Sequence, residues 1–171
     1  MHAAAYQFVC EMLAYYGQPS SVVEIGSYNV NGSVRPLFVK AIALDQYVGI
    51  DTREGPGVDV VCDGARYRAT KKRFPEGVEF VICCEVLEHA RNARALVLNA
   101  CRMLNAGGLL VLTCATDPRA AHPCGPTFNG PEYYRNVNPE DAKKWLEQAK
   151  LTSYAVRVQS ALGDLYAWGS K

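Results

Sequence analysis

Four short apolar runs in the first half of the chain each carry an acidic residue at or near their end. The runs cover residues 21–26, 47–51, 58–63 and 78–84, and the acidic residues are Glu24, Asp51, Asp63 and Glu85. Segments with helix signals separate the runs, so we predict strands that alternate with helices. Such alternation is typical of a doubly wound α/β fold, a mostly parallel sheet covered on both faces. Ligands of these folds bind at the carboxyl ends of the strands, where all four acidic residues should gather.

The remaining elements follow from periodicity and from capping signals. We predict helices over residues 3–16, 33–44, 64–74, 85–104 with a break near Asn92, and 139–150 with Asn138 as its N-cap. Further strands are predicted over residues 109–114, 154–158 and 165–168. No repeat or linker interrupts the pattern, so we expect a single domain over residues 1–171, with a loop at 115–138 on the acceptor side of the site.

Composition excludes several classes of protein. Hydrophobic residues make up 49% of the 171 residues, charged residues 20%, and the net charge is +1, which fits a globular protein and gives no general electrostatic reason to expect nucleic acid or an anionic membrane. The longest apolar run, residues 107–115, is shorter than the roughly 20 residues of a membrane span. The seven cysteines show no C-x-x-C pair, so we expect reduced thiols, no metal and a cytoplasmic location.

The turn after the first run indicates the kind of nucleotide. Gly26 opens it, but Tyr28 stands where a dinucleotide-binding turn would have its second glycine, and Glu24 would repel a pyrophosphate. S-adenosylmethionine has an ammonium, a sulfonium, a ribose diol and an adenine, but no phosphate. Carboxylates at positions 51 and 63 can accept hydrogen bonds from the ribose hydroxyls and the adenine amino group. The sequence therefore favours S-adenosylmethionine over NAD.

Several motifs resemble the class I S-adenosylmethionine-dependent methyltransferases, and within them the type 11 small-molecule group. They are VVEIGS at 22–27, VGID at 48–51, VCDGA at 61–65, EVLEH at 85–89 and MLNAGG at 103–108, with NGSVRPLF at 31–38 and GPGVD at 55–59 similar to one subgroup. The likeness covers about residues 20–170. It implies a Rossmann-like, seven-stranded sheet in the order 3-2-1-4-5-7-6 with strand seven antiparallel. It departs from the family at Tyr28 and in a longer turn.

The resemblance and the strand ends together predict a cofactor site. Its residues are Glu24, Gly26, Ser27, Asn31, Gly32, Asp51, Thr52, Cys62, Asp63, Gly64 and Glu85. The expected cofactor is S-adenosylmethionine and the product S-adenosylhomocysteine.

Catalytic candidates are fewer, because a neutral leaving group needs mainly positioning and an acceptor hydroxyl needs a base. Glu85 and His89, which would share a helix face, and His122 on the long loop are the candidates for that base. Tyr133, Tyr134 and Arg135 are candidates for substrate binding. Each also has a structural alternative: His89 as an ordinary helix-face residue, His122 as a solvated loop residue, and the aromatic pair as an anchor for the loop.

We expect the acceptor to be a small molecule such as a sugar, a polyol or another metabolite, bound by the loop at 115–138 and the N-terminal helix. The site should be open unless the loop closes or a homodimer covers it. Five basic residues between positions 66 and 73 leave a nucleic-acid or protein methyltransferase open as an alternative, with a solvated helix face as the plainer interpretation. A non-catalytic module that binds S-adenosylmethionine is the second alternative.

Overall fold

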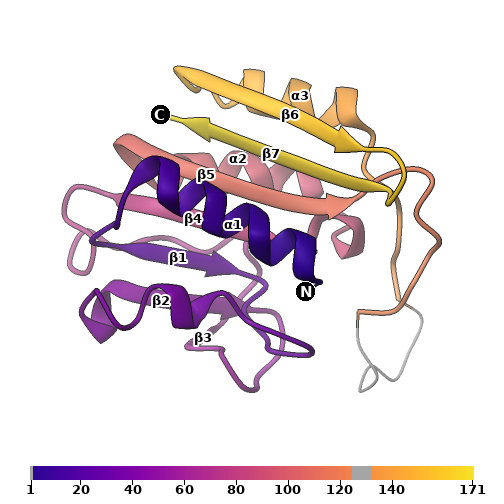
Figure 1. Cartoon of the computed structure of the whole chain (residues 1–171). Helices are drawn as coiled ribbons and strands as arrows, with labels where there is room; N and C mark the ends of the chain where they lie inside the picture. Colours follow the sequence, from indigo (N-terminus) through magenta and orange to yellow (C-terminus); the bar gives the residue numbers. More distant parts are fainter. Residues whose placement is uncertain (1, 125–131) are drawn as a thin grey trace.

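The computed structural model describes residues 2–124 and 132–171. A helix precedes the first strand, further helices follow the fourth and the fifth strands, and a strand pair ends the chain (Figure 1). The order is α1 (Ala3–Tyr16), β1 (Val22–Ile25), η1 (Arg35–Leu37), η2 (Leu44–Gln46), β2 (Tyr47–Asp51), β3 (Val60–Val61), β4 (Val78–Cys84), η3 (Leu87–His89), α2 (Ala93–Met103), β5 (Leu104–Ala115), α3 (Pro139–Gln148), β6 (Ser153–Gln159) and β7 (Asp164–Ser170).

These strands form one 7-stranded sheet in the order β3-β2-β1-β4-β5-β7-β6. Strands β1 to β5 run parallel, and β7 is antiparallel to both β5 and β6. The predicted fold class, strand order and antiparallel strand are therefore confirmed. In the register, Ile25 lies opposite Ile50 in β2 and Cys83 in β4, so the residues that follow these strands meet at one edge of the sheet.

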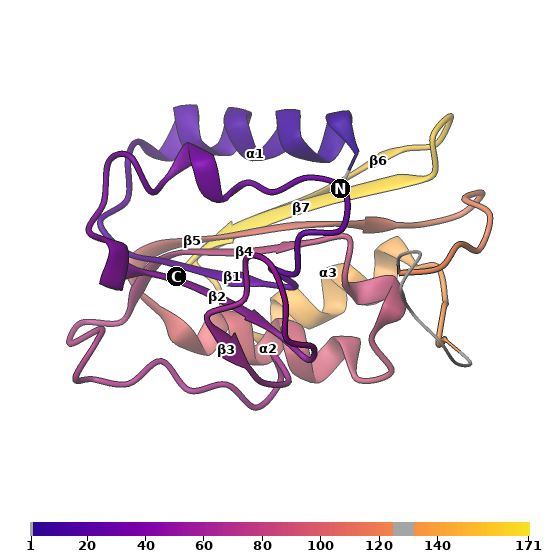
Figure 2. The ribbon, with the colours of Figure 1, turned by 90° about the horizontal axis from the view of Figure 1, so that it is seen from below.

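Helices cover the two faces of the sheet unequally. Helix α1 lies on one face, and α2 and α3 lie on the other (Figure 2). On the first face Phe8 packs against the ring of Tyr166, while Phe38 packs against Tyr47 and Phe80. On the second face a larger apolar cluster joins α2 and α3 to the sheet. Burial of these apolar side chains fixes the strand ends in place.

The structure contradicts two predicted helices. Residues 33–44 form the short η1, hydrogen-bonded turns and the start of η2. The Arg35 side chain donates to the Gly57 carbonyl at 3.0 Å and to the Asp59 carboxylate at 2.9 Å, which ties this segment to the β2–β3 loop. Residues 64–74 form turns as well. The Asn99 side chain, from α2, donates to the carbonyls of Gly64 and Tyr67 at 2.8 and 2.9 Å and so satisfies backbone acceptors without a helix.

Other boundaries shift less. The third strand shortens to β3, and the predicted helix 85–104 divides into η3 and α2, with the break near Asn92 confirmed. The Asn138 side chain accepts from the Glu140 N–H and caps α3 as expected. Strand β5 begins earlier than predicted, at Leu104. Within the described residues, the helices are too short or too polar to span a lipid bilayer.

Candidate functional site

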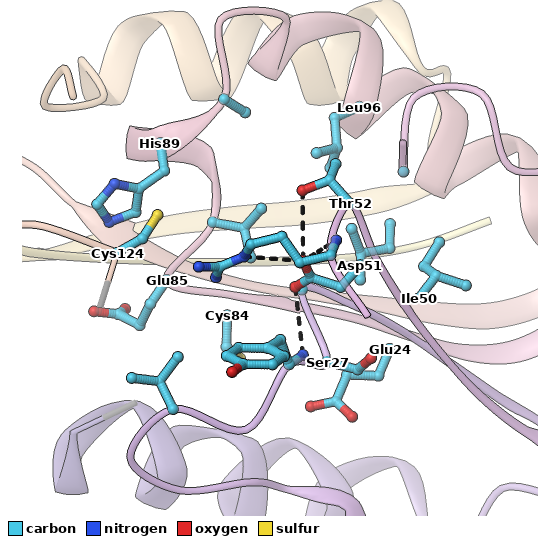
Figure 3. A pocket seen from close by; sticks show the side chains of 18 of the residues that line it. Glu24, Ser27, Ile50, Asp51, Thr52, Cys84, Glu85, His89, Leu96 and Cys124 are labelled. Carbon is cyan, nitrogen blue, oxygen red and sulfur yellow. Dashed lines mark hydrogen bonds and ion pairs between the residues drawn. The ribbon is translucent and has the colours of Figure 1, made fainter. Parts of the chain in front are cut away.

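A cavity of about 540 Å³ opens at the carboxyl edge of β1, β2 and β4. All eleven residues predicted to bind the cofactor line it, as do His89, His122 and Tyr133. Tyr134 and Arg135 lie outside its lining. Figure 3 shows Glu24, Asp51 and Glu85 reaching this cavity from neighbouring strands. The structure therefore brings together the acidic strand ends that the sequence placed far apart.

The turn after β1 requires a glycine at its first position. Gly26 has φ +79°, and a Cβ atom there would lie 2.1 Å from a Val86 methyl carbon. The N–H groups of Gly26 and Ser27 both donate to the Ile50 carbonyl, at 2.8 and 3.1 Å, which holds the turn against β2. The Ser27 hydroxyl oxygen is buried with no hydrogen-bond partner. This oxygen is consequently free to bond to a ligand in the cavity.

Tyr28, the residue that departs from the family pattern, packs on the β2–β3 loop. A Cβ atom on Gly55 would lie 1.9 Å from the Tyr28 ring, so the ring sits directly over this glycine. The Arg53 guanidinium lies 4.7 Å from the centre of the same ring. Gly57, with φ +90°, approaches the Ser27 carbonyl so closely that a Cβ would lie 2.4 Å from it. The Gly-Pro-Gly segment thus provides the space that a tyrosine in the turn needs.

Asp51 and Asp63 are held in position by backbone and side-chain donors. The Asp51 carboxylate, 11% exposed, accepts from the N–H groups of Arg53 at 3.0 Å and Tyr28 at 3.3 Å. One Asp63 oxygen accepts from the Ala65 N–H at 2.9 Å, and the other accepts from the Asn92 amide at 3.1 Å. A carboxylate has about four lone-pair sites, so both residues keep acceptor capacity for a ligand.

Glu24 differs from these two because it is buried. Its carboxyl is 7% exposed and accepts from the Tyr47 hydroxyl at 2.5 Å. Burial raises the pKa of Glu24 to about 7, against the hydrogen bond from Tyr47 and the charge of Arg35, which lower it. Near neutral pH Glu24 is therefore only partly ionised, and it adds less negative potential to the cavity than the sequence suggested.

Glu85 follows β4 in a left-handed backbone conformation, φ +57°, that few side chains adopt. One carboxylate oxygen accepts from the Thr113 hydroxyl at 2.8 Å, and the other lies 3.3 Å from His2 Nε2. Burial acts to raise the pKa of Glu85, but the hydrogen bonds from His2 and Thr113 and the nearby positive charges lower it overall. Glu85 is therefore ionised at neutral pH, in the cavity wall.

His2 and Arg119 complete a charged group around Glu85. His2 Nε2 also lies 3.4 Å from the buried Asp164, and the Arg119 guanidinium contacts Asp164 and lies 4.0 Å from Glu85. The hydrogen bond to Glu85 raises the pKa of His2 above its ordinary value. Sequence reasoning missed both residues, because neither stands in a motif; they reach the site from the start of α1 and from the segment after β5.

His89 does not share a helix face with Glu85, contrary to the prediction, because the chain turns between them and enters the short η3. His89 lies instead against His122 and Tyr134, with ring centres 5.4 Å from each, and these two are 4.9 Å apart. Glu88 lies behind this group, fully buried. His122, the loop residue predicted from the sequence, therefore contacts His89. Glu85 is paired with His2 instead.

The three residues predicted to bind substrate, Tyr133, Tyr134 and Arg135, differ in where they lie relative to the cavity. The Tyr133 ring lines the cavity and lies 4.8 Å from the Arg91 guanidinium. Tyr134 contacts His89 and His122, which line the cavity. Arg135 is exposed, and its backbone N–H donates to the Glu88 carbonyl at 2.8 Å, so it acts as an anchor for the loop. Residues 125–131 of the predicted acceptor loop lie outside the described residues.

The basic residues at positions 66–73 are partly used inside the molecule. Arg68 donates to the Asn99 side chain at 2.7 Å, and Arg73 donates to the carbonyls of Asp45 and Tyr47. The segment is therefore not the predicted helix, and two of its cations hold loops together, while Arg66, Lys71 and Lys72 are exposed.

No protein-family model matches the sequence, and no curated protein matches it either. Solved structures do match over nearly the whole chain. A 1,6-didemethyltoxoflavin-N1-methyltransferase from Burkholderia thailandensis, solved with S-adenosylhomocysteine, is 14% identical with a TM-score of 0.67, over 99% of this chain and 78% of that chain. The N-methyltransferase NodS from Bradyrhizobium japonicum is 16% identical with a TM-score of 0.59, over 98% and 85%. Magnesium protoporphyrin IX methyltransferase from Synechocystis, solved with S-adenosylmethionine, is 17% identical with a TM-score of 0.62, over 97% and 79%. At identities this low, the similarity shows a shared fold alone.

Proposed function

We propose that this chain, which has the class I methyltransferase fold, transfers a methyl group from S-adenosylmethionine to a small-molecule acceptor. The observation that carries the proposal is the meeting of Asp51, Asp63 and Glu85, from three different strand ends, around one cavity. Their spacing along the sequence alone does not require them to meet. Carboxylates in this arrangement suit a cationic nucleoside without phosphates.

The residues present fit this cofactor. Asp51 would accept from the ribose hydroxyls, Asp63 from the adenine amino group, and the Gly64 N–H would donate to the ring. The Gly26 turn, with the unpartnered Ser27 hydroxyl beside it, would hold the methionine end. When bound, S-adenosylmethionine supplies a methyl group on a sulfonium, which leaves as a neutral thioether. Every other requirement falls on the protein: to orient the acceptor and to exclude water.

A dinucleotide fits less well. Its pyrophosphate would need backbone N–H groups free at the turn, but Gly26 and Ser27 both donate to Ile50, and Tyr28 donates to Asp51. The carboxylates of Asp51 and Glu85 would also repel the phosphates. We therefore favour the phosphate-free ligand.

Glu85 is the best placed of the predicted catalytic residues. It is ionised, it lines the cavity, and its Oε2 atom lies 3.3 Å from His2 Nε2. A hydroxyl or amine acceptor that approaches Glu85 would pass its proton to this pair. Tyr133 and Arg119 would form the rest of the acceptor wall.

The free thiols support a reducing, cytoplasmic location. All seven cysteines lie in the described part of the chain, and none forms a disulfide. Cys83, Cys101 and Cys114 are buried, where they serve as apolar core residues.

Isothermal titration calorimetry with S-adenosylmethionine, S-adenosylhomocysteine and NAD tests the cofactor. We expect binding of the first two and none of NAD. A panel of sugars, polyols, amines and an oligonucleotide, assayed for S-adenosylhomocysteine release, then tests transfer. Turnover on a small molecule supports the proposal. Tight binding of the cofactor without turnover of any acceptor would favour a non-catalytic binding module, and turnover of the oligonucleotide alone would favour a nucleic-acid methyltransferase.

A further inference from the structure

Five side chains of the kinds that bind transition metals meet at one end of the cavity. They are Glu88, His89, His122, Cys124 and Glu132, which we call the His89 cluster. One candidate ligand atom from each of Glu88, His89 and His122 lies within 4.8 Å of the other two, and the same holds for His89, Cys124 and Glu132. His89 belongs to both triads. In Figure 3 the sulfur of Cys124 lies beside the His89 ring.

Both histidines are oriented as metal ligands usually are. The Nδ1 atom of His122 lies 3.2 Å from the Ala120 carbonyl, which leaves Nε2 free for a ligand. The His89 ring is hydrogen-bonded to the Tyr133 backbone, while its own Nδ1 is buried with no partner. A metal-binding histidine typically donates its second ring N–H to a backbone carbonyl or carboxylate, which fixes the ring and its tautomer.

The two carboxyl groups each present one unpartnered oxygen. Glu88 is 0% exposed; its Oε1 accepts from the Ala115 N–H at 3.1 Å, and its Oε2 has no partner. The Oε2 atom of Glu132 accepts from the Cys124 N–H at 2.5 Å, and its Oε1 is buried without a partner. Buried polar atoms are rarely left unpaired, because each lost hydrogen bond costs about 1–3 kcal/mol. Three such atoms in one cluster indicate a missing ligand.

From this geometry we propose that the His89 cluster binds one Zn²⁺ ion, with His89, the residue that both triads share, as one of its ligands. Imidazole, thiolate and carboxylate together are the donors that Zn²⁺ prefers, whereas Mg²⁺ and Ca²⁺ take oxygen alone. Ligand atoms around tetrahedral Zn²⁺ lie about 3.3–3.8 Å apart, and within each triad the candidate ligand atoms lie no more than 4.8 Å apart. The alternative is that the two imidazoles simply pack against Tyr134. This explains the ring contacts, but it does not explain why Glu88 Oε2, Glu132 Oε1 and His89 Nδ1 lack hydrogen-bond partners.

The position of the cluster indicates what the ion would do. His89, His122, Cys124 and Glu132 line the same cavity as Glu85, on the side away from Asp51 and Asp63 along the strand order. If the proposed methyl transfer is correct, on which this part of the inference rests, an ion here would bind an anionic or lone-pair group of the acceptor. The acceptor class would then include carboxylates, thiols and phenols.

Metal binding is measured on the whole chain, without cofactor or acceptor. After removal of metal with a chelator, we expect Zn²⁺, titrated against a chromophoric chelator, to bind at one equivalent. Co²⁺ in its place should give intense visible bands typical of tetrahedral coordination, with a thiolate-to-metal charge-transfer band. The variants His89→Ala and His122→Ala should each lose about 100-fold or more in Zn²⁺ affinity. Cys124→Ser should abolish the charge-transfer band.

Two control variants separate this site from general effects. His2→Gln removes the remaining histidine of the chain and Cys10→Ser removes a cysteine of α1, and both should keep full Zn²⁺ affinity. Affinity for S-adenosylhomocysteine, measured on every variant, reports folding and the cofactor site separately. Failure to bind Zn²⁺ while S-adenosylhomocysteine still binds would overturn the metal site alone. Zn²⁺ binding that survives both His89→Ala and His122→Ala would overturn it as well.

Discussion

Replacing Asp51 by asparagine tests the cofactor site most directly. The side chain stands at the end of β2, and its two oxygens accept from Arg53 at 3.0 Å and from Tyr28 at 3.3 Å. Asparagine has the same shape and can keep the bond from Arg53, so the loops on either side should remain in place. It removes the charge and one acceptor oxygen that the ribose hydroxyls would use.

The expected loss of affinity follows from the value of a hydrogen bond to a charged group. Such a bond contributes about 1.5–3 kcal/mol, which corresponds to a loss of about 10- to 150-fold in affinity. Asp51→Asn should fall toward the lower end of this range, because the amide can still donate to a hydroxyl. Asp51→Ala removes both polar atoms and also leaves the Tyr28 N–H without its acceptor, so it should fall toward the upper end.

Calorimetry with S-adenosylhomocysteine measures the effect on the wild-type chain and on both variants. Asp45→Asn is the matched control, since Asp45 lies in η2 with an exposed side chain, away from the cavity lining. Urea unfolding of each variant checks that the fold is kept. If Asp51→Ala bound S-adenosylhomocysteine as tightly as the wild type, Asp51 would not hold the ribose and the reasoning that places the cofactor here would be refuted.

Three further changes test other parts of the structure. Gly26→Ala should lower the free energy of unfolding by about 1–3 kcal/mol in urea titrations, because the new Cβ would lie 2.1 Å from a Val86 methyl carbon. Adding Val86→Ala should recover part of the loss. An unchanged urea midpoint for Gly26→Ala would contradict the close contact. Burial raises the pKa of Glu24 from 4.5 to about 7, so between these pH values the folded chain keeps a proton that the unfolded chain releases. The free energy of unfolding should therefore fall by up to about 1.4 kcal/mol per pH unit as the pH rises from 4.5 to about 7. Glu24→Gln should flatten that slope, and an unaltered slope would show that Glu24 is not its source. Glu85→Gln should lower kcat by about 10²- to 10⁴-fold if Glu85 is the base, with little change in affinity for S-adenosylhomocysteine, and an unchanged kcat would exclude that role.

Strand positions and acidic strand ends could be predicted from the sequence, because the signals for them are local. Apolar runs such as 78–84 have the length and bounding residues of a buried strand, and β4 spans Val78–Cys84 as predicted. The cap of α3 depends only on neighbours, since Asn138 accepts from the N–H of Glu140. Asp51 was found for the same reason, because it ends β2, and Asp63 follows closely after β3.

The two helices that were predicted wrongly show where local signals fail. Residues 33–44 and 64–74 have residues compatible with a helix, but their backbone groups and cations find partners elsewhere. Asn99 satisfies carbonyls of the second segment, and Arg35 of the first binds Asp59. Tertiary hydrogen bonds of this kind outweigh helix propensities that are worth only a few tenths of a kcal/mol per residue.

By itself, then, the sequence determined where most of the strands lie, the strand order through its family motifs, and the acidic residues at or just after the strands. Only the tertiary structure decided which side chains face those residues. It placed His2 beside Glu85 and brought His122, Cys124 and Glu132 to His89. The physical reason is that these contacts join positions far apart in the chain, and their geometry is fixed by how α1 and the segment after β5 pack on the sheet rather than by any residue spacing.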